Sequence, residues 1–360
     1  MCAAEAVPAA IGDDELASLF SIFPDAGVVI LAVSGGADST ALLLLAGRWR
    51  ASRASGPELV AATVDHGLRS ESRSESEAVG ALARRLGIPH HTLAWEGEKP
   101  PTGVEAAARE ARYALLVSLA ARLGASAIAT AHTLDDQAET VLMRLAAGSG
   151  PAGLAGMRPK DQRQGIAVLR PLLGVRKRRL MATLARDGIA WAEDPMNADP
   201  RFARPRLRAA AAALEREGLT PERLARLARR MARWDDAMAH SAQALQATLR
   251  EPDFGGEPDD SIDGWVLLNV SEEVVLRVLG NEIRAAAGQP HDARLRLERL
   301  ESLWEAILLG IVRRQPVRRT LGGAVISLSA KGRLSFTRAA PRRTPAAGRP
   351  VKAAQTVHQK

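Results

Sequence analysis

The chain has 360 residues, of which 46% are hydrophobic, so it is long enough for two or three domains with proper cores. Its single cysteine, Cys2, excludes an internal disulfide and any Cys-x-x-Cys zinc or redox site. There is no run of about 18 uncharged apolar residues, and the acidic first 15 residues lack the basic region of a secretion signal. We therefore expect a cytoplasmic protein with no membrane partner.

Positive charge is concentrated in the second half of the sequence. The net charge is +8, but Ala306 to Lys360 holds twelve Lys or Arg and no Asp or Glu, which leaves −4 for the first 305 residues. A second basic segment, 201–240, has ten arginines and five acidic residues. Such segments are typical of proteins that bind nucleic acid, although a solvated basic surface has the same composition.

The first informative segment lies between an apolar run at 27–33 and a leucine run at 42–45. It consists of Ser34, Gly35, Gly36, Ala37, Asp38 and Ser39. The flanking runs predict a buried strand and a helix, so the segment is a strand-to-helix loop. The glycines let the backbone approach a ligand, and the serine hydroxyls and the N–H groups of the helix start point at an anion.

This loop is not a Walker loop, because no Gly-Lys-Ser/Thr follows to supply a lysine for a terminal phosphate. It resembles the loop of ATP pyrophosphatases, which cut ATP between the α and β phosphates. Asp38 would then lie near a Mg²⁺ ion that bridges the phosphates. A glycine turn with Asp38 as an ordinary helix cap is the alternative.

Strand and helix signals alternate over the first 200 residues. Strands are predicted at 27–34, 59–65, 90–95 and 127–132, with helices at 38–50, 72–87 and 104–124 between them. This order predicts an α/β fold with a doubly wound, mostly parallel sheet. Ligands then bind beyond the carboxyl ends of the strands, where Ser34, Asp65 and His132 fall.

The rest of the chain changes character after Pro205. Helices are predicted at 206–217, 221–249, 271–287 and 293–309, and two short strands at 323–329 and 332–337. Residues 340–360 are rich in Pro, Ala and Arg, a composition that predicts disorder. We expect a catalytic α/β domain at 1–200, a helical domain at 201–305 and a small basic segment with a disordered tail at 306–360.

Four further motifs accompany the loop. They are Val-Asp-His-Gly-Leu-Arg at 64–69, a segment at 103–113 that contains Arg109 and Arg112, Thr-Ala-His-Thr-Leu-Asp-Asp-Gln-Ala-Glu-Thr at 130–140, and Glu-Asp-Pro-Met-Asn-Ala-Asp at 193–199. In this order and spacing, over residues 27 to 208, they resemble the tRNA(Ile)-lysidine synthetase family of the PP-loop, or N-type ATP pyrophosphatase, superfamily.

The resemblance implies an adenine nucleotide α-hydrolase-like first domain, a tRNA-binding helical domain and a two-step ligation. ATP adenylates the C2 oxygen of the wobble cytidine of tRNA(Ile) with a CAU anticodon, and pyrophosphate leaves. Free L-lysine then displaces AMP through its ε-amine and forms lysidine. Decoding switches from AUG to AUA, and the identity of the tRNA from methionine to isoleucine.

The candidate site residues follow from this resemblance. ATP would contact the loop residues Ser34, Gly35, Gly36, Ala37, Asp38 and Ser39, together with Asp65 and His66. The catalytic candidates are Asp38, Asp136, Arg109, Arg112 and His132; the lysine or Mg²⁺ candidates are Asp135, Asp136 and Glu139, with Asp38 and Asp136 as metal ligands; and the tRNA candidates are Arg204, Arg206 and Arg208.

Each candidate also has a plain structural explanation. Asp65 and His66 can form a strand-end turn, Arg109 and Arg112 can be solvated helix arginines three residues apart, and His132 can be a structural histidine. Asp135, Asp136 and Glu139 can be acids at a helix start. The three arginines alternate, so in an extended stretch they would point to one side, or they are a solvated linker. Asp136 is the leading general base by position alone.

Three residues depart from the family pattern. His132-Thr133 stands where two histidines are usual, Met196 where threonine is usual, and Pro205 where asparagine is usual. Proline lacks a backbone donor and can alter the path of the arginine segment.

Two rival functions remain. A sulfur-inserting enzyme needs cysteines that the chain lacks, and a non-catalytic RNA-binding protein would not need the intact loop. A homodimer is compatible with basic surfaces on two copies that embrace one tRNA.

Overall fold

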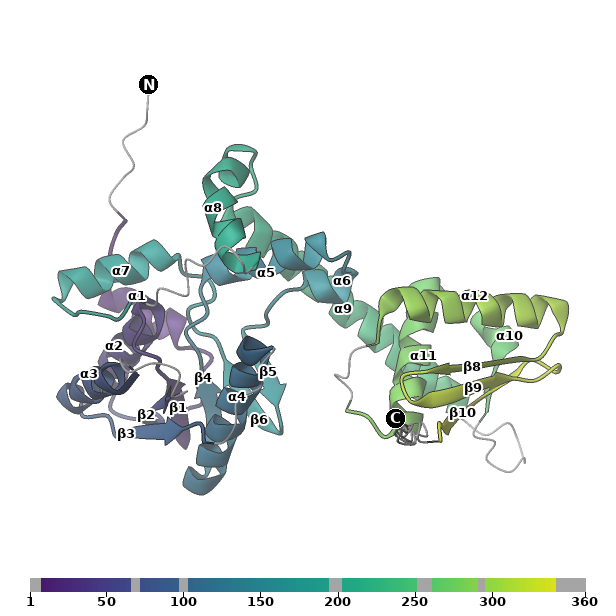
Figure 1. The fold of residues 1–360 in the computed structure, drawn as a ribbon, viewed down its shortest axis with the longest axis horizontal. Helices are drawn as coiled ribbons and strands as arrows, with labels where there is room; N and C mark the ends of the chain where they lie inside the picture. The colour runs from purple at the N-terminus through teal and green to yellow at the C-terminus, as the bar shows by residue number, and fades with distance from the viewer. Residues whose placement is uncertain are drawn as a thin grey trace, which may run out of the picture. The chain divides into compact units, whose positions relative to one another are not determined.

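A computed structural model describes residues 8–65, 72–96, 103–193, 203–250, 261–290 and 295–340. The chain forms two compact units that divide between Asp235 and Asp236. Figure 1 shows the course of the chain through the helices and strands of each unit. None of the described helices has both the length and the apolar character that a membrane span requires. The expected disordered tail lies almost wholly outside the described residues.

The first unit is built on a six-stranded sheet in the order β3-β2-β1-β4-β6-β5. Its strands are β1 (Val28–Ala32), β2 (Glu58–Asp65), β3 (His90–Ala94), β4 (Ala125–Ala129), β5 (Lys160–Arg163) and β6 (Ile166–Leu169). All neighbours are parallel except β5, which is antiparallel to β6. The predicted α/β fold with a mostly parallel sheet is therefore confirmed, and the four predicted strands match β1 to β4.

Helices accompany this sheet along the chain. They are α1 (Asp13–Leu19), α2 (Ala37–Ala51), α3 (Ser72–Arg85), α4 (Val104–Leu123), α5 (Leu134–Ala146), α6 (Pro151–Leu154), α7 (Lys177–Arg186), α8 (Ala203–Arg216) and the first part of α9 (Pro221–Arg250). Side chains alternate across β1, so Val29 and Leu31 pack into the cluster that holds α2, whereas Ile30 packs with Leu116 and Leu119 of α4. The sheet thus has a hydrophobic layer on each face.

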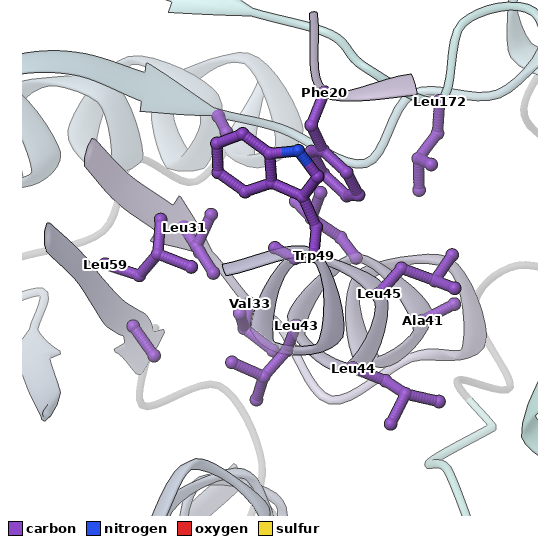
Figure 2. Packing of buried hydrophobic residues seen from close by; sticks show 14 of the residues in the cluster. Phe20, Leu31, Val33, Ala41, Leu43, Leu44, Leu45, Trp49, Leu59 and Leu172 are labelled. Carbon is purple, nitrogen blue, oxygen red and sulfur yellow. The ribbon is translucent and has the colours of Figure 1, made fainter. Parts of the chain in front are cut away.

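Helix α2 is buried on almost every side, because its sequence is apolar all round. Figure 2 shows Leu43, Leu44 and Leu45 projecting from different sides of α2, in one cluster with Leu31 and Leu59 of the sheet and with Phe20 and Trp49. This packing fixes the start of α2, and with it the loop at 33–36, in place.

Two features of the first unit differ from the sequence prediction. The β5–β6 hairpin was not predicted, because β5 is a short polar strand, and it turns at Gln164 and Gly165, both with positive φ. The helix predicted at 206–217 begins earlier, at Ala203, so the arginines at 204–208 lie in α8 and not in the extended stretch considered for them. Pro205 lies in the first turn of α8, where N–H groups have no intrahelical acceptor, so it does not break the helix.

The second unit combines helices with a four-stranded antiparallel sheet in the order β7-β10-β9-β8. The elements are β7 (Ile262–Asp263), α10 (Gly264–Leu267), α11 (Glu272–Ala287), α12 (Leu297–Arg313), β8 (Val317–Leu321), β9 (Ala324–Leu328) and β10 (Arg333–Arg338). The apolar residues of α11, α12 and the sheet form one core. The two predicted strands match β9 and β10, whereas β8 was missed because its middle is polar and exposed.

We expect Leu42→Ala to destabilise the first unit by about 2–5 kcal/mol, because Leu42 is fully buried in α2 and the substitution leaves a cavity. Urea denaturation followed by circular dichroism measures this loss. The control is Leu145→Ala, whose side chain is half exposed and should lose far less. Equal losses in the two variants would contradict the packing described for α2.

Candidate active site

The loop between β1 and α2 is held in a fixed conformation by its own hydroxyl groups. Ser39 Oγ accepts a hydrogen bond from the Ser34 N–H at 3.1 Å and donates one to the Gly36 carbonyl at 3.0 Å. Thr40 Oγ1 donates to the Gly35 carbonyl at 3.1 Å. Gly35 has φ of +89°, a conformation that strains any residue with a Cβ. The loop is therefore pre-shaped, with the N-terminus of α2 open to an anion.

The loop lies at the point where the strand order of the sheet reverses. β1 has β2 on one side and β4 on the other, so the helices that follow β1 and β4 begin on either side of the same crevice. The segment that leads to the Glu193 motif also reaches the loop, since the Ala192 N–H donates to the Gly35 carbonyl at 2.9 Å. Asp194 to Asp199 lie outside the described residues.

Asp38 occupies the first turn of α2 and has a cationic partner from a distant helix. Its Oδ2 lies 3.2 Å from Nζ of Lys177, the first residue of α7. Its Oδ1 is buried and accepts no hydrogen bond from the described residues. Burial raises the pKa of Asp38, Lys177 opposes this shift, and the charges of Asp136 and Asp135 add to it. An inward, partnerless carboxylate oxygen beside an anion-binding loop fits a divalent cation.

Helix α5 begins with a reciprocal cap. Asp136 N donates to Thr133 Oγ1, and Thr133 N and Oγ1 both donate to Asp136 Oδ2 at 2.9 Å. This arrangement explains why Thr133 is favourable where the family pattern has histidine, since threonine caps a helix well. These hydrogen bonds fix the orientation of Asp136, and its Oδ1 lies 3.9 Å from Arg208 Nη2.

Asp135 and Glu139 are also engaged by basic residues. Asp135 Oδ2 accepts a hydrogen bond from the Lys177 N–H at 2.7 Å, and its Oδ1 lies 3.1 Å from Arg176 Nε. Glu139 is buried and receives two hydrogen bonds from Arg208, Nε to Oε1 at 2.5 Å and Nη2 to Oε2 at 3.1 Å. Burial alone would lower the pKa of Arg208, but its bonds to Glu139 raise it above the ordinary value.

The three tRNA candidates are therefore separated by the helix. Arg208 faces the carboxylates of α5, whereas Arg206, two residues earlier, projects about 200° away around α8. The side chain of Arg204 lies outside the described residues. The expected one-sided row of arginines is replaced by one arginine in the site and another on a different face.

The remaining candidates lie around the same edge of the sheet. His132 Nδ1 is 2.9 Å from Thr130 Oγ1 at the end of β4. On α4, the Arg109 guanidinium lies 5.5 Å from the ring centre of Tyr113, and Arg112 is exposed. Asp65 ends β2 and lines a polar hollow of about 350 Å³ with Ser76, Glu77, Gly80, Arg84, His90 and Thr92. His66 lies outside the described residues.

Sequence reasoning missed Arg176 and Lys177, which contact Asp135 and Asp38. One signal was present: four consecutive basic residues, 176–179, stand at a helix start, where the helix dipole disfavours positive charge. Such a run needs acidic partners from elsewhere in the fold.

Comparison with known proteins agrees with this architecture. A model of the PP-loop domain family matches residues 13–214, so the chain is a PP-loop protein. The tRNA thiolase NcsA from Methanococcus maripaludis, solved with its [4Fe-4S] cluster, superposes with a TM-score of 0.52 over 61% of this chain and 77% of its own, at 16% identity. That likeness concerns the fold alone.

Closer relatives define the family. A tRNA(Ile)-lysidine synthase from Bradyrhizobium sp. is 49% identical over 340 residues, which cover 91% of this chain and 95% of the relative. One from Methylobacterium sp. strain 4-46 is 52% identical over 320 residues, which cover 88% and 91%. The chain belongs to the tRNA(Ile)-lysidine synthase family.

We expect Asp38→Asn to raise the melting temperature at pH 7. A raised pKa means that the ionised carboxylate of Asp38 destabilises the folded state, and the uncharged amide of asparagine removes this destabilisation. The gain in melting temperature is fully present above the pKa that Asp38 has in the folded protein. It disappears as the pH falls below the ordinary pKa of aspartate, because the carboxyl of the wild-type protein is then protonated in the folded and the unfolded state alike.

Thermal melts at neutral and acidic pH measure this effect, and about 1 kcal/mol corresponds to 2–4 °C for a unit of this size. Asp25→Asn, at an exposed position, is the control and should change neither melt. A lower melting temperature of Asp38→Asn at pH 7 would mean that the ion pair with Lys177 outweighs the cost of burial.

Proposed function

We infer that this protein ligates free lysine to C2 of the wobble cytidine of tRNA(Ile) with a CAU anticodon, using ATP and forming lysidine. The observation that carries the inference is the pre-shaped loop with Asp38 near Asp135 and Asp136, in a chain about half identical to tRNA(Ile)-lysidine synthases over most of its length. We place the reaction in the cytoplasm, where ATP, free lysine and tRNA meet.

In the first step, the C2 oxygen of cytosine attacks the α-phosphorus of ATP, and the bond from that phosphorus to the bridging oxygen of pyrophosphate breaks. The N–H groups at the start of α2 and the hydroxyl of Ser34 are suited to hold the phosphates, whereas Ser39, whose proton goes to the Gly36 carbonyl, keeps the loop in shape. Lys177 supplies from α7 the cation that the loop itself lacks. Mg²⁺ held by Asp38, with Asp136 as a second carboxylate, would neutralise phosphate charge.

In the second step, the ε-amine of lysine attacks C2, the C2–O bond breaks, and AMP leaves. The amine must first lose a proton, and Asp136 is our proposed acceptor of that proton. Thr133 donates both of its hydrogen bonds to Oδ2 of Asp136, which leaves Oδ1 to take the proton. Glu139, Asp136 and Arg208 place opposite charges within one cluster. Such a cluster matches the ammonium and carboxylate groups of a free amino acid. Arg109 and Arg112 remain proposed contacts of phosphates or of the carboxylate of lysine, and His132 a proposed contact of a phosphate or the base.

The tRNA body would be bound through the basic surfaces. In the second unit, a hollow of about 250 Å³ lies between α12 and β8 and is lined by Arg313, Arg318 and Arg319, all exposed, with Leu309 and Pro316 between them. Guanidinium groups around an apolar floor suit the phosphates and sugars of RNA. Arg204 and Arg206 are proposed to contact the anticodon loop, and a homodimer on one tRNA is a further proposal.

A sulfur-inserting function is disfavoured by the single cysteine of the sequence. A non-catalytic RNA-binding protein is disfavoured because Ser34, Ser39, Asp38 and Asp136 are all present and ordered by hydrogen bonds or ion pairs.

The function is tested by incubating the protein with ATP, Mg²⁺, labelled lysine and a transcript of tRNA(Ile) with a CAU anticodon. We expect ATP-dependent label in this RNA with release of pyrophosphate, and none in a methionine tRNA with the same anticodon. Asp38→Ala should abolish pyrophosphate release and leave tRNA affinity nearly unchanged. Pyrophosphate release without label would make lysine the wrong nucleophile, and tight tRNA binding without any reaction would favour the binding protein.

We expect the double variant Arg318→Ala/Arg319→Ala to weaken tRNA binding and to reduce the slope of log affinity against log salt by about 1–2, since each lost phosphate contact removes somewhat less than one unit. Filter binding at several salt concentrations measures both. The matched control, Arg85→Ala/Arg122→Ala, removes two exposed arginines from the first unit. An unchanged slope in the first double variant would exclude this surface as a tRNA contact.

A further inference from the structure

Helix α7 begins in an unusual way. Arg176 occupies its N-cap position and makes no capping hydrogen bond, although serine, threonine, aspartate or asparagine is preferred there. The cap comes instead from another helix, because Asp135 at the start of α5 accepts the Lys177 N–H at 2.7 Å. The side chain of Arg176 is thereby left for other contacts.

Those contacts join three helices. Arg176 Nη2 donates to Glu215 Oε1 at 3.1 Å near the end of α8, and Nη1 donates to Glu222 Oε1 at 3.0 Å in the first turn of α9. Nε lies 3.1 Å from Asp135 Oδ1, an ion pair whose geometry is not that of a hydrogen bond. Only 18% of the Arg176 side chain is exposed. Three carboxylates thus converge on one guanidinium.

The guanidinium is strongly held as a cation. Burial alone would lower the pKa of Arg176, but its hydrogen bond to Glu222 and the charge of Asp135 raise it above its ordinary value. Without this cation, Asp135, Glu215 and Glu222 would repel one another at short range, so the end of α8 and the start of α9 would lose their attachment to the start of α5.

Helix α8 carries Arg208, the residue whose guanidinium reaches Glu139 and Asp136. Helix α8 is therefore held by two ion pairs: Arg208, near its middle, binds Glu139 of α5 directly, and Glu215, in its last turn, binds Arg176 at the start of α7. Between the helices, Leu224 and Ala228 of α9 pack on Ala138 and Val141 of α5. Figure 1 shows α8 next to α5.

We propose that Arg176 is a positioning residue: it clamps the α8–α9 helical hairpin to the start of α5 and so holds Arg208 at the carboxylates that receive lysine. Arg176 itself contacts no reacting atom. The inference rests on the proposed function for its kinetic test, whereas its structural test needs no substrate.

The structural test compares amide hydrogen exchange in four proteins: wild type, Arg176→Ala, Glu215→Gln/Glu222→Gln and Arg178→Ala. Arg178 is exposed two residues further along the chain and is the matched control. We expect exchange in residues 207–216 to rise about tenfold or more in the first two variants and to stay unchanged in the control. The double glutamine variant changes two partly exposed residues, so it remains informative even if Arg176→Ala folds poorly. Unchanged exchange in both would overturn the proposal.

The kinetic test separates the two steps of the reaction. In Arg176→Ala we expect the KM for lysine to rise about tenfold or more, because a displaced Arg208 binds lysine badly, while pyrophosphate release in the first step stays within about twofold. Arg176→Lys should restore part of the loss, since one ammonium can meet only part of the three carboxylates. Adding Arg176→Ala to the double glutamine variant should cause little further loss.

The outcomes are distinct. Equal loss of both steps, or an additive effect in the triple variant, would overturn the positioning role. If wild type transfers no lysine while the exchange of α8 still depends on Arg176, the proposed lysine transfer fails and the clamp stands.

Discussion

The architecture of the site depends on keeping several carboxylates close together. The negative charges of Asp135 and Asp136 both raise the pKa of Asp38, and the buried Glu139 lies one turn further along α5. Such a cluster is stable only if cations compensate it. They come from outside the motif-bearing helices: Lys177 and Arg176 from the start of α7, and Arg208 from α8. The packing of α7 and α8 is therefore a condition for the acidic cluster to exist.

The parallel sheet decides where this cluster forms. Because β1 and β4 are neighbours and the chain leaves them toward the same edge, the starts of α2 and α5 meet there, each with acidic residues in its first turn. The partial positive charge of both helix starts favours acids at these positions. The same geometry that stabilises the carboxylates thus also points N–H groups at a phosphate.

The parts of the fold with strong local patterns could be predicted from sequence. The apolar run before Ser34, the periodicity of α4 and the motif at 130–140 each carry their structure within a few residues. The candidate site residues Asp38, Asp136 and Glu139 followed from the same motifs. Their pairing did not, because Lys177 and Asp38 are 139 positions apart in sequence and Arg208 and Glu139 are 69 apart. The alternating arginines were also compatible with an extended segment. The alanine-rich sequence after Arg208 favours a helix instead, and this helix reaches back to Ala203.

One feature of the second unit has a consequence for solubility. β8 is the edge strand of its sheet, and Arg318, Arg319 and Thr320 stand exposed along its middle. An edge strand offers unpaired backbone groups to a strand from another molecule, and charged side chains discourage that pairing. The exposed arginines of β8 thus protect the protein from sheet-to-sheet aggregation. Neutral residues in place of both arginines would open this edge to pairing with a second molecule.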